Sequence, residues 1–136
     1  MPYALAELAG IGPDNVDKLR AVGIRTTDKL LEMAKDPKGR QRLADQTGID
    51  VKRILRWANL ADRMRIKGVG EDYAELLREA GVDTIKELGY RNPEKLAHSM
   101  AEANVRRKLV RVLPSNRAVV RWIEHAKRLQ IKIRYK

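Results

Sequence analysis

The side chains with the clearest chemical potential in this sequence are cations gathered over its last quarter. Residues 104–136 contain eleven lysines and arginines and one acidic residue, Glu124, so this segment carries a net charge of +10 out of +11 for the whole chain. Residues 1–103 hold 18 basic and 17 acidic residues and are close to neutral. Guanidinium and ammonium groups bind phosphate oxygens, and a surface of one charge sign attracts a polyanion. The charge distribution therefore predicts a polyanionic partner.

A second chemical feature is a pair of glycine turns, Gly10-Ile11-Gly12 and Gly68-Val69-Gly70, each followed by helical apolar spacing. Glycine permits a tight turn and the close approach of another group to the backbone. The helix that follows begins with free N–H groups at the positive end of its dipole, which favours a bound phosphate. We therefore predict two backbone anion sites, with Ile11 and Val69 packed between the helices. The alternative is that each turn only packs its two helices together.

The second glycine turn is the stronger candidate for binding. Lys67 directly precedes it, whereas Ala9 precedes the first turn. Pro13 follows the first turn and removes one N–H donor. Acidic residues follow both turns, where they stabilise a helix dipole and also repel phosphate. We rank Lys67 and Gly68–Gly70 above Gly10–Gly12, whose features are those of a mainly structural turn.

The basic segment also has the pattern of an amphipathic helix over residues 117–132. Its cations fall within about 80° of one another on a helical wheel, opposite an apolar side that includes Trp122. Such a stripe suits a phosphate backbone. The predicted contacts are Arg106, Arg107, Arg111, Arg117, Arg121, Arg128 and Lys132. The alternatives are a solvated charged face and a membrane-surface helix, and the second is disfavoured because the apolar side resembles an ordinary core.

The elements that must position these groups occur twice. At an offset of 58 residues, eight of the 21 positions from Gly10 to Leu30 are identical, and residues 54–66 align with 119–131 at an offset of 65. Within each copy the apolar residues recur at steps of three and four, which is the spacing of helices. We predict an all-α protein of nine or ten short helices. Its parts are a first unit (1–66), a second unit with the basic helix (67–131) and a basic tail (132–136), with the two units packed as one compact domain.

Capping residues give the expected helix boundaries. Gly23 and Gly81 are predicted to end helices because glycine adopts the left-handed conformation that follows a helix. Polar residues and Asp/Asn-Pro pairs are predicted to begin helices. These N-terminal signals are Thr26 or Thr27, Asp36-Pro37, Asp50, Asp83 or Thr84, and Asn92-Pro93.

The segments LAGIGPDNVDKLRAVGI (8–24) and IKGVGEDYAELLREAGV (66–82) resemble the helix-hairpin-helix motif. With RTTDKLL and DTIKEL after them, they are similar to the hairpins of the C-terminal domain of the bacterial RNA polymerase alpha subunit. The whole chain resembles an uncharacterised bacterial and archaeal family of tandem helix-hairpin-helix proteins, a domain of unknown function. The resemblance implies two tandem helix-hairpin-helix units whose hairpins contact DNA without sequence preference.

Residues 43–57 form a rival pattern, a helix-turn-helix with Gly48 in its turn. Its second helix would present Lys52, Arg53 and Arg56 to a DNA groove. Asp50 at the start of that helix is a poor reader of bases in this position, so sequence-specific binding is not favoured.

The sequence argues against an enzyme, a cofactor site and a metal site. It has no cysteine, which excludes a zinc–thiolate site, a disulfide framework and a cysteine nucleophile. His98 with Glu94 and Glu102 has metal-ligand spacing, but ion pairing along a helix face explains it better. Gly68–Gly70 lacks the preceding strand and the lysine–serine/threonine pair of a nucleotide loop. We expect no catalysis, no cofactor and no metal.

Location and partner follow from the same features. No apolar run approaches the about 18–20 residues that span a bilayer, and the first ten residues lack the basic region of a signal peptide. We expect a cytoplasmic protein, nucleoid-associated if it binds DNA, with no membrane partner. The favoured function is binding of double-stranded DNA without sequence preference. The alternatives are an interaction adaptor whose basic helix docks an acidic protein, and binding of structured RNA.

Overall fold

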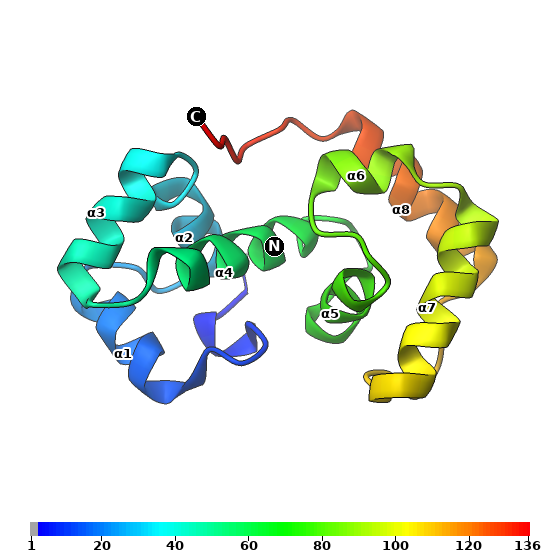
Figure 1. The fold of residues 1–136 in the computed structure, drawn as a ribbon, viewed down its shortest axis with the longest axis horizontal. Coiled ribbons are helices and arrows are strands. Elements are labelled where there is room, and N and C mark those ends of the chain that lie inside the picture. Colours follow the sequence, from blue (N-terminus) through cyan, green and yellow to red (C-terminus); the bar gives the residue numbers. More distant parts are fainter. Residues whose placement is uncertain (1–2) are drawn as a thin grey trace. The chain divides into compact units, whose positions relative to one another are not determined.

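The computed structural model describes residues 3–136, which fold into helices and connecting segments (Figure 1). Within this range there is no strand beyond one isolated antiparallel bridge between Ala4 and Thr26, so the all-α prediction is confirmed. In chain order the elements are the short 3₁₀-helix η1 (Leu5–Glu7) and the α-helices α1 (Gly12–Ala21), α2 (Thr27–Met33), α3 (Pro37–Thr47), α4 (Val51–Arg63), α5 (Glu71–Glu79), α6 (Ile85–Tyr90), α7 (Pro93–Arg107) and α8 (Asn116–Arg128).

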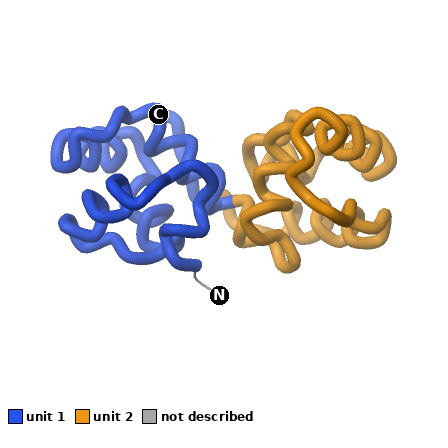
Figure 2. The backbone as a smooth tube through the Cα atoms, turned by 90° about the horizontal axis from the view of Figure 1, so that it is seen from below, with its two compact units in different colours: residues 1–62, 132–136 blue, residues 63–131 orange. Residues whose placement is uncertain are grey.

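The backbone forms two compact units (Figure 2). The first unit runs to Asp62 and also takes in Lys132–Lys136, and the second comprises Arg63–Ile131. The glycine turn at Gly68 and the whole of α8 therefore belong to the same unit. None of the helices in residues 3–136 is long and apolar enough to cross a membrane.

The first unit has a continuous aliphatic interior. Leu19, Leu30, Leu43 and Ile54 are buried there, together with Trp57 on α4. Burial of these side chains supplies most of the stabilisation, at about 1.5–3 kcal/mol each. Trp57 therefore fills the core position that its aliphatic neighbours predict.

The second unit is organised around α8. This helix packs against α6 and α7, and α7 in turn packs against α5. The apolar side of α8 places Val119, Trp122 and Ile123 in the core. Trp57 and Trp122, which align at an offset of 65 residues, are thus both core residues.

Local capping chemistry sets most helix boundaries where the sequence predicts them. The side chains of Thr26, Asp36, Thr84 and Asn92 each accept a hydrogen bond from the backbone N–H three residues later. Such caps satisfy N–H groups that have no partner inside the helix. Gly23 and Gly81 adopt φ values of +89° and +96° directly after the C-cap residues of α1 and α5. Left-handed glycine at this position closes the last helical turn, as expected.

The structure ends the last helix earlier than the sequence pattern predicts. Helix α8 stops at Arg128, and Leu129 is already extended, with φ −75° and ψ 141°. Beyond it the tail joins the first unit, where Ile133 is buried and the backbone N–H of Arg134 donates to the carbonyl of Lys35 at 2.7 Å. An extended tail makes both contacts, whereas a continued helix would turn Ile133 and this N–H elsewhere.

Candidate nucleic-acid interface

The second glycine turn is a tight reversal between residues 66 and 69. The N–H of Val69 donates to the carbonyl of Ile66 at 3.0 Å, and Gly68 adopts φ +90°. Val69 is fully buried between the flanking helices, as predicted, while Lys67 is exposed. A Cβ atom on Gly68 would lie 3.3 Å from Trp122 Nε1 on α8. Glycine is therefore required here both for its backbone conformation and for the close approach of α8.

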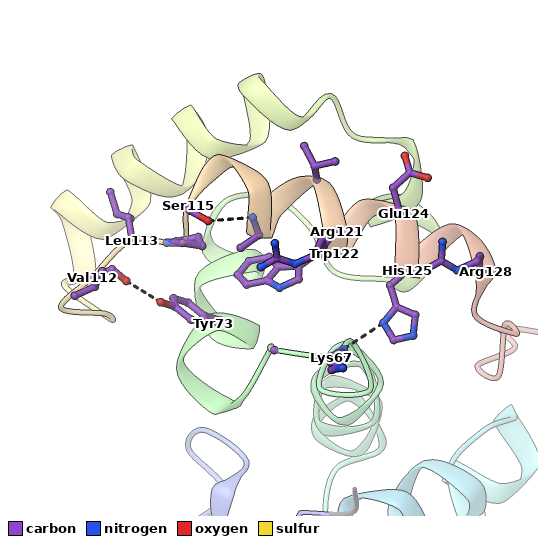
Figure 3. Close-up of a pocket in the computed structure, with 14 residues that line it drawn as sticks. Lys67, Tyr73, Val112, Leu113, Ser115, Arg121, Trp122, Glu124, His125 and Arg128 are labelled. Atoms are coloured by element: carbon purple, nitrogen blue, oxygen red, sulfur yellow. Dashed lines mark hydrogen bonds between the residues drawn. The ribbon is translucent and has the colours of Figure 1, made fainter.

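A hydrogen bond joins this turn directly to α8. The backbone N–H of Lys67 donates to Nδ1 of His125 at 3.2 Å (Figure 3). In this hydrogen bond Nδ1 acts as the acceptor. His125 thus positions the turn relative to the helix that carries the basic residues.

Two backbone donors of the turn remain available to a ligand. Within residues 3–136 the N–H groups of Gly68 and Gly70 donate to no other group, and Gly70 is the N-cap of α5. Gly70 lies at the N-terminus of α5, where the positive end of the helix dipole favours an anion. The acidic side chains of Glu71 and Asp72 follow in the first turn of α5 and oppose that affinity.

An open groove of about 870 Å³ lies between the turn and α8. Tyr73 and Trp122 form its aromatic base, with ring centroids 5.3 Å apart. The cations Lys67, Arg121 and Arg128 border it (Figure 3). The groove therefore combines an apolar base with a positively charged border.

The structure brings three predicted cations of α8 onto one exposed side. Arg117, Arg121 and Arg128 are all exposed, and Arg121 and Arg128 line the groove. Arg111 is exposed in the segment between α7 and α8, beside a second open groove that reaches Gly68 and Gly70. Lys67 and these four arginines lie in the same unit as the glycine turn.

Two other predicted arginines form hydrogen bonds within the second unit. Arg107 Nη1 lies 2.5 Å from Glu79 Oε1, and Arg106 Nη2 donates to the Glu79 carbonyl at 3.4 Å. These contacts fix the end of α7 against α5. Arg106 and Arg107 consequently have less capacity to bind an external phosphate than the arginines of α8.

Lys132 does not extend the basic stripe. The helix over 117–132 was expected to carry it on the same face as Arg128, but α8 ends at Arg128 and Lys132 belongs to the tail of the first unit. There its charge contributes to the lowered pKa of Glu32, after the hydrogen bond and charge of Lys35. The burial of Ile133 is the physical reason that the stripe is interrupted.

The first glycine turn begins like the second and then differs. Ile11 N–H donates to the Leu8 carbonyl at 3.1 Å, Gly10 adopts φ +75°, and Ile11 is buried as predicted. However, Gly12 also adopts a positive φ of +74°, whereas Gly70 has φ −94°. Helix α1 therefore starts at Gly12 itself, with Pro13 as its next residue and without that donor.

The role of His125 was missed at the level of the sequence, where it counts only as a member of the basic stripe. The repeat contains a signal for it, because His125 aligns with Leu60 at the offset of 65 residues. A histidine that replaces a core leucine in one copy indicates a role specific to that copy. The role of Tyr73 could not be read from the sequence either, because its hydroxyl donates to the carbonyl of Val112, 39 residues later, at 2.9 Å.

The structure also describes the helix-turn-helix pattern and the histidine–glutamate cluster that the sequence offered as other candidate sites. Helices α3 and α4 are joined through Gly48 in the left-handed conformation, but the Arg53 guanidinium lies over the Trp57 ring at 5.0 Å. His98 Nε2 pairs with Glu102 at 3.1 Å on an exposed helix face. Among the residues described, no group of three histidine, aspartate or glutamate side chains is arranged to hold a metal ion.

These features define an all-α protein whose second unit holds a glycine turn against a basic helix. Residues 9–129 match the family described as Domain of unknown function (DUF4332), and because the match spans most of the chain, the protein belongs to that family. The expected membership of a family without an assigned function is thereby confirmed. No curated protein and no solved structure matches the chain.

Proposed function

We propose that this protein binds double-stranded DNA through the phosphate backbone, without sequence preference. The observation that carries the proposal is the hydrogen bond between Lys67 and His125. It places the glycine turn beside the helix that carries Arg117, Arg121 and Arg128. Donors held in fixed positions lose less conformational entropy when a ligand binds.

The chemistry of these groups favours phosphate over bases. Guanidinium groups bind phosphate oxygens through paired N–H donors, and free backbone N–H groups bind them singly. Neither contact carries sequence information. The acidic residues at the start of α5 weaken the turn as an anion site, so we assign most of the affinity to the arginines and a positioning role to the turn.

The resemblance to helix-hairpin-helix proteins supports the same function. The turns at Gly10 and Gly68 share the hydrogen bond from residue i to residue i−3 and the buried aliphatic residue that follows the glycine. We infer that both units are helix-hairpin-helix units. The second is the DNA-binding one, because only it has Lys67, the basic helix and a turn free of proline.

A salt titration tests this function. Affinity for two unrelated duplexes is measured by fluorescence anisotropy at increasing salt concentration. We expect equal affinities and a slope of log K against log salt of about −4 to −5, corresponding to about five phosphates neutralised. Unequal affinities would indicate base reading, and absence of binding at about 0.15 M salt would overturn the proposal. Stronger binding of duplex RNA in competition would assign the surface to RNA.

A pair of charge-reversed variants tests the assignment to residues. Replacing Arg117, Arg121 and Arg128 together by glutamate is expected to abolish measurable duplex binding. The control replaces Lys18, Arg20 and Arg25, which are exposed on the first unit, and changes the net charge equally. We expect the control to retain most of the affinity. Circular dichroism establishes that both variants keep their helices.

A further inference from the structure

Phosphate binding leaves the apolar part of the groove unexplained. Val112, Leu113 and Val120 line it and are 72%, 41% and 42% exposed. A phosphate backbone offers nothing that would cover these aliphatic groups. Exposed aliphatic groups gathered beside an apolar base are typical of a surface that another molecule covers.

The border of the groove determines the charge of that molecule. Lys67, Arg121 and Arg128 line the groove, and the carboxylate of Glu124 is 3.8 Å from Nζ of Lys127 on its own helix. The groove therefore presents a net positive charge around an apolar centre. Complementarity calls for a ligand with apolar groups in the middle and carboxylates at the sides.

The walls of the groove are held by hydrogen bonds in the free protein. Tyr73 donates to the carbonyl of Val112, and both residues line the groove. Ser115 caps α8 by accepting from the N–H of Ala118. A groove that is formed before binding requires little ordering when a ligand enters.

We propose that this groove docks an acidic amphipathic segment of a partner protein. Apolar side chains of the segment would cover Leu113 and Val120, and its carboxylates would face Arg121 and Arg128. A nucleobase fits less well, because stacking needs an exposed aromatic face, whereas Trp122 is buried and the half-buried Tyr73 ring packs against it. The inference goes beyond DNA binding, and since both ligands use Arg121 and Arg128, the partner and DNA compete.

A peptide selection provides the first test. A phage library of random peptides is selected on the wild-type protein, with prior depletion on the bare support. We expect enriched sequences that combine acidic residues with large apolar residues. No enrichment, or enriched sequences that lack either type, would overturn the proposal.

Matched variants then separate the two functions of the surface. An enriched peptide is synthesised with a fluorescent label and its affinity is measured by anisotropy. We expect Leu113→Ser/Val120→Ser to weaken peptide binding more than about tenfold and to leave duplex affinity unchanged. The control Val105→Ser removes an aliphatic residue that is 77% exposed on α7 outside the groove, and neither affinity should change. Arg121→Glu/Arg128→Glu should weaken both.

The outcomes distinguish this inference from the proposed function. Peptide binding that survives Leu113→Ser/Val120→Ser would overturn the groove as the docking site. Concentration-dependent dimerisation in sedimentation that the same variant abolishes would assign the groove to a second copy of the chain instead. Peptide binding with no duplex binding would overturn the DNA function and leave the docking groove standing. Duplex binding with no peptide enrichment would overturn the docking groove and leave the DNA function standing.

Discussion

Nδ1 of His125 accepts a hydrogen bond from the backbone N–H of Lys67 at 3.2 Å, and the Cβ position of Gly68 faces Trp122 one helical turn earlier on α8. One helix therefore holds the glycine turn at two consecutive residues. The same helix carries the arginines that border the groove. The position of the turn relative to these cations thus depends on His125 and on the absence of a side chain at residue 68.

Replacing His125 by alanine should loosen the turn and weaken both stability and binding. The lost hydrogen bond is worth about 0.5–1.5 kcal/mol in the free energy of unfolding, measured by urea denaturation. We expect duplex affinity to fall by about three- to tenfold, because the donors are no longer held in position. His125→Asn keeps an acceptor oxygen and should recover part of both losses. His98→Ala on the exposed face of α7 serves as the control, and an equal effect there would contradict the role of His125.

Alanine substitutions at Gly68 and Gly70 test whether the turn requires glycine at residue 68. Gly68→Ala places a Cβ at φ +90° and 3.3 Å from Trp122 Nε1, and we expect it to lower the free energy of unfolding by about 1–3 kcal/mol. Gly70 has φ −94° and no atom within 4 Å of its Cβ position, so Gly70→Ala should change the stability by less than about 1 kcal/mol. Urea denaturation of both variants measures the difference. Equal losses would show that the turn tolerates both residues alike.

The helix boundaries were predictable because capping is local. Thr26, Asp36 and Asn92 cap helices through hydrogen bonds that span three residues, and such signals are complete within a short stretch of sequence. The burial of Val69 was predictable for the same reason, since a single aliphatic residue between two glycines has one place to pack.

The contacts that escaped prediction join residues far apart in the chain. Lys67 and His125 are 58 residues apart, and the Arg40 guanidinium donates to the carbonyl of Arg134 across 94 residues. Helical periodicity continues through residues 129–132, but the burial of Ile133 in the first unit outweighs it. The alternation of Ile131, Ile133 and Tyr135 with Lys132, Arg134 and Lys136 indicates an extended arm, but the helical spacing through residue 132 overlaps it. The placement of Lys132 on the helix was wrong because α8 ends at Arg128.

Ile131 and Ile133 make the packing of the tail testable. Ile133 is 6% exposed and Ile131 is 59% exposed, although both are apolar residues that alternate with basic residues in the tail. We expect Ile133→Ser to lower the free energy of unfolding by about 1.5–3 kcal/mol, because a buried aliphatic side chain is lost. Ile131→Ser should change it by less than about 0.5 kcal/mol. A ranking in the opposite order would show that the tail does not pack on the first unit.

The ionised carboxylate of Asp36 makes the stability of the first unit depend on pH in the acidic range. Its carboxylate accepts from the Gly39 N–H at 2.8 Å, which lowers the pKa of this group, and Arg134 at 3.6 Å lowers it further. Because the folded pKa lies below the unfolded value, the stabilisation is fully present above the unfolded pKa of about 3.9 and is lost as the pH falls through the folded pKa. Urea midpoints of wild type and Asp36→Asn should therefore differ at pH 6 and converge under acid. A difference that stays constant with pH would contradict the assignment to this carboxylate.

Charge reversal at Arg128 and at Lys132 distinguishes DNA binding by positioned cations on α8 from a general attraction by net charge. Arg128 is held on α8 at the groove, whereas Lys132 lies in the tail beyond the end of that helix. Both Arg128→Glu and Lys132→Glu change the net charge by the same amount, so a purely general attraction would weaken duplex binding equally in the two variants. We expect Arg128→Glu to reduce the affinity by about tenfold and the magnitude of the salt slope by about one, because one phosphate contact is lost. Lys132→Glu should reduce the affinity by no more than about threefold, since only the long-range attraction changes. Anisotropy titrations at several salt concentrations measure both quantities, and equal slopes and affinities for the two variants would show that the position of these cations on the fold has no part in binding.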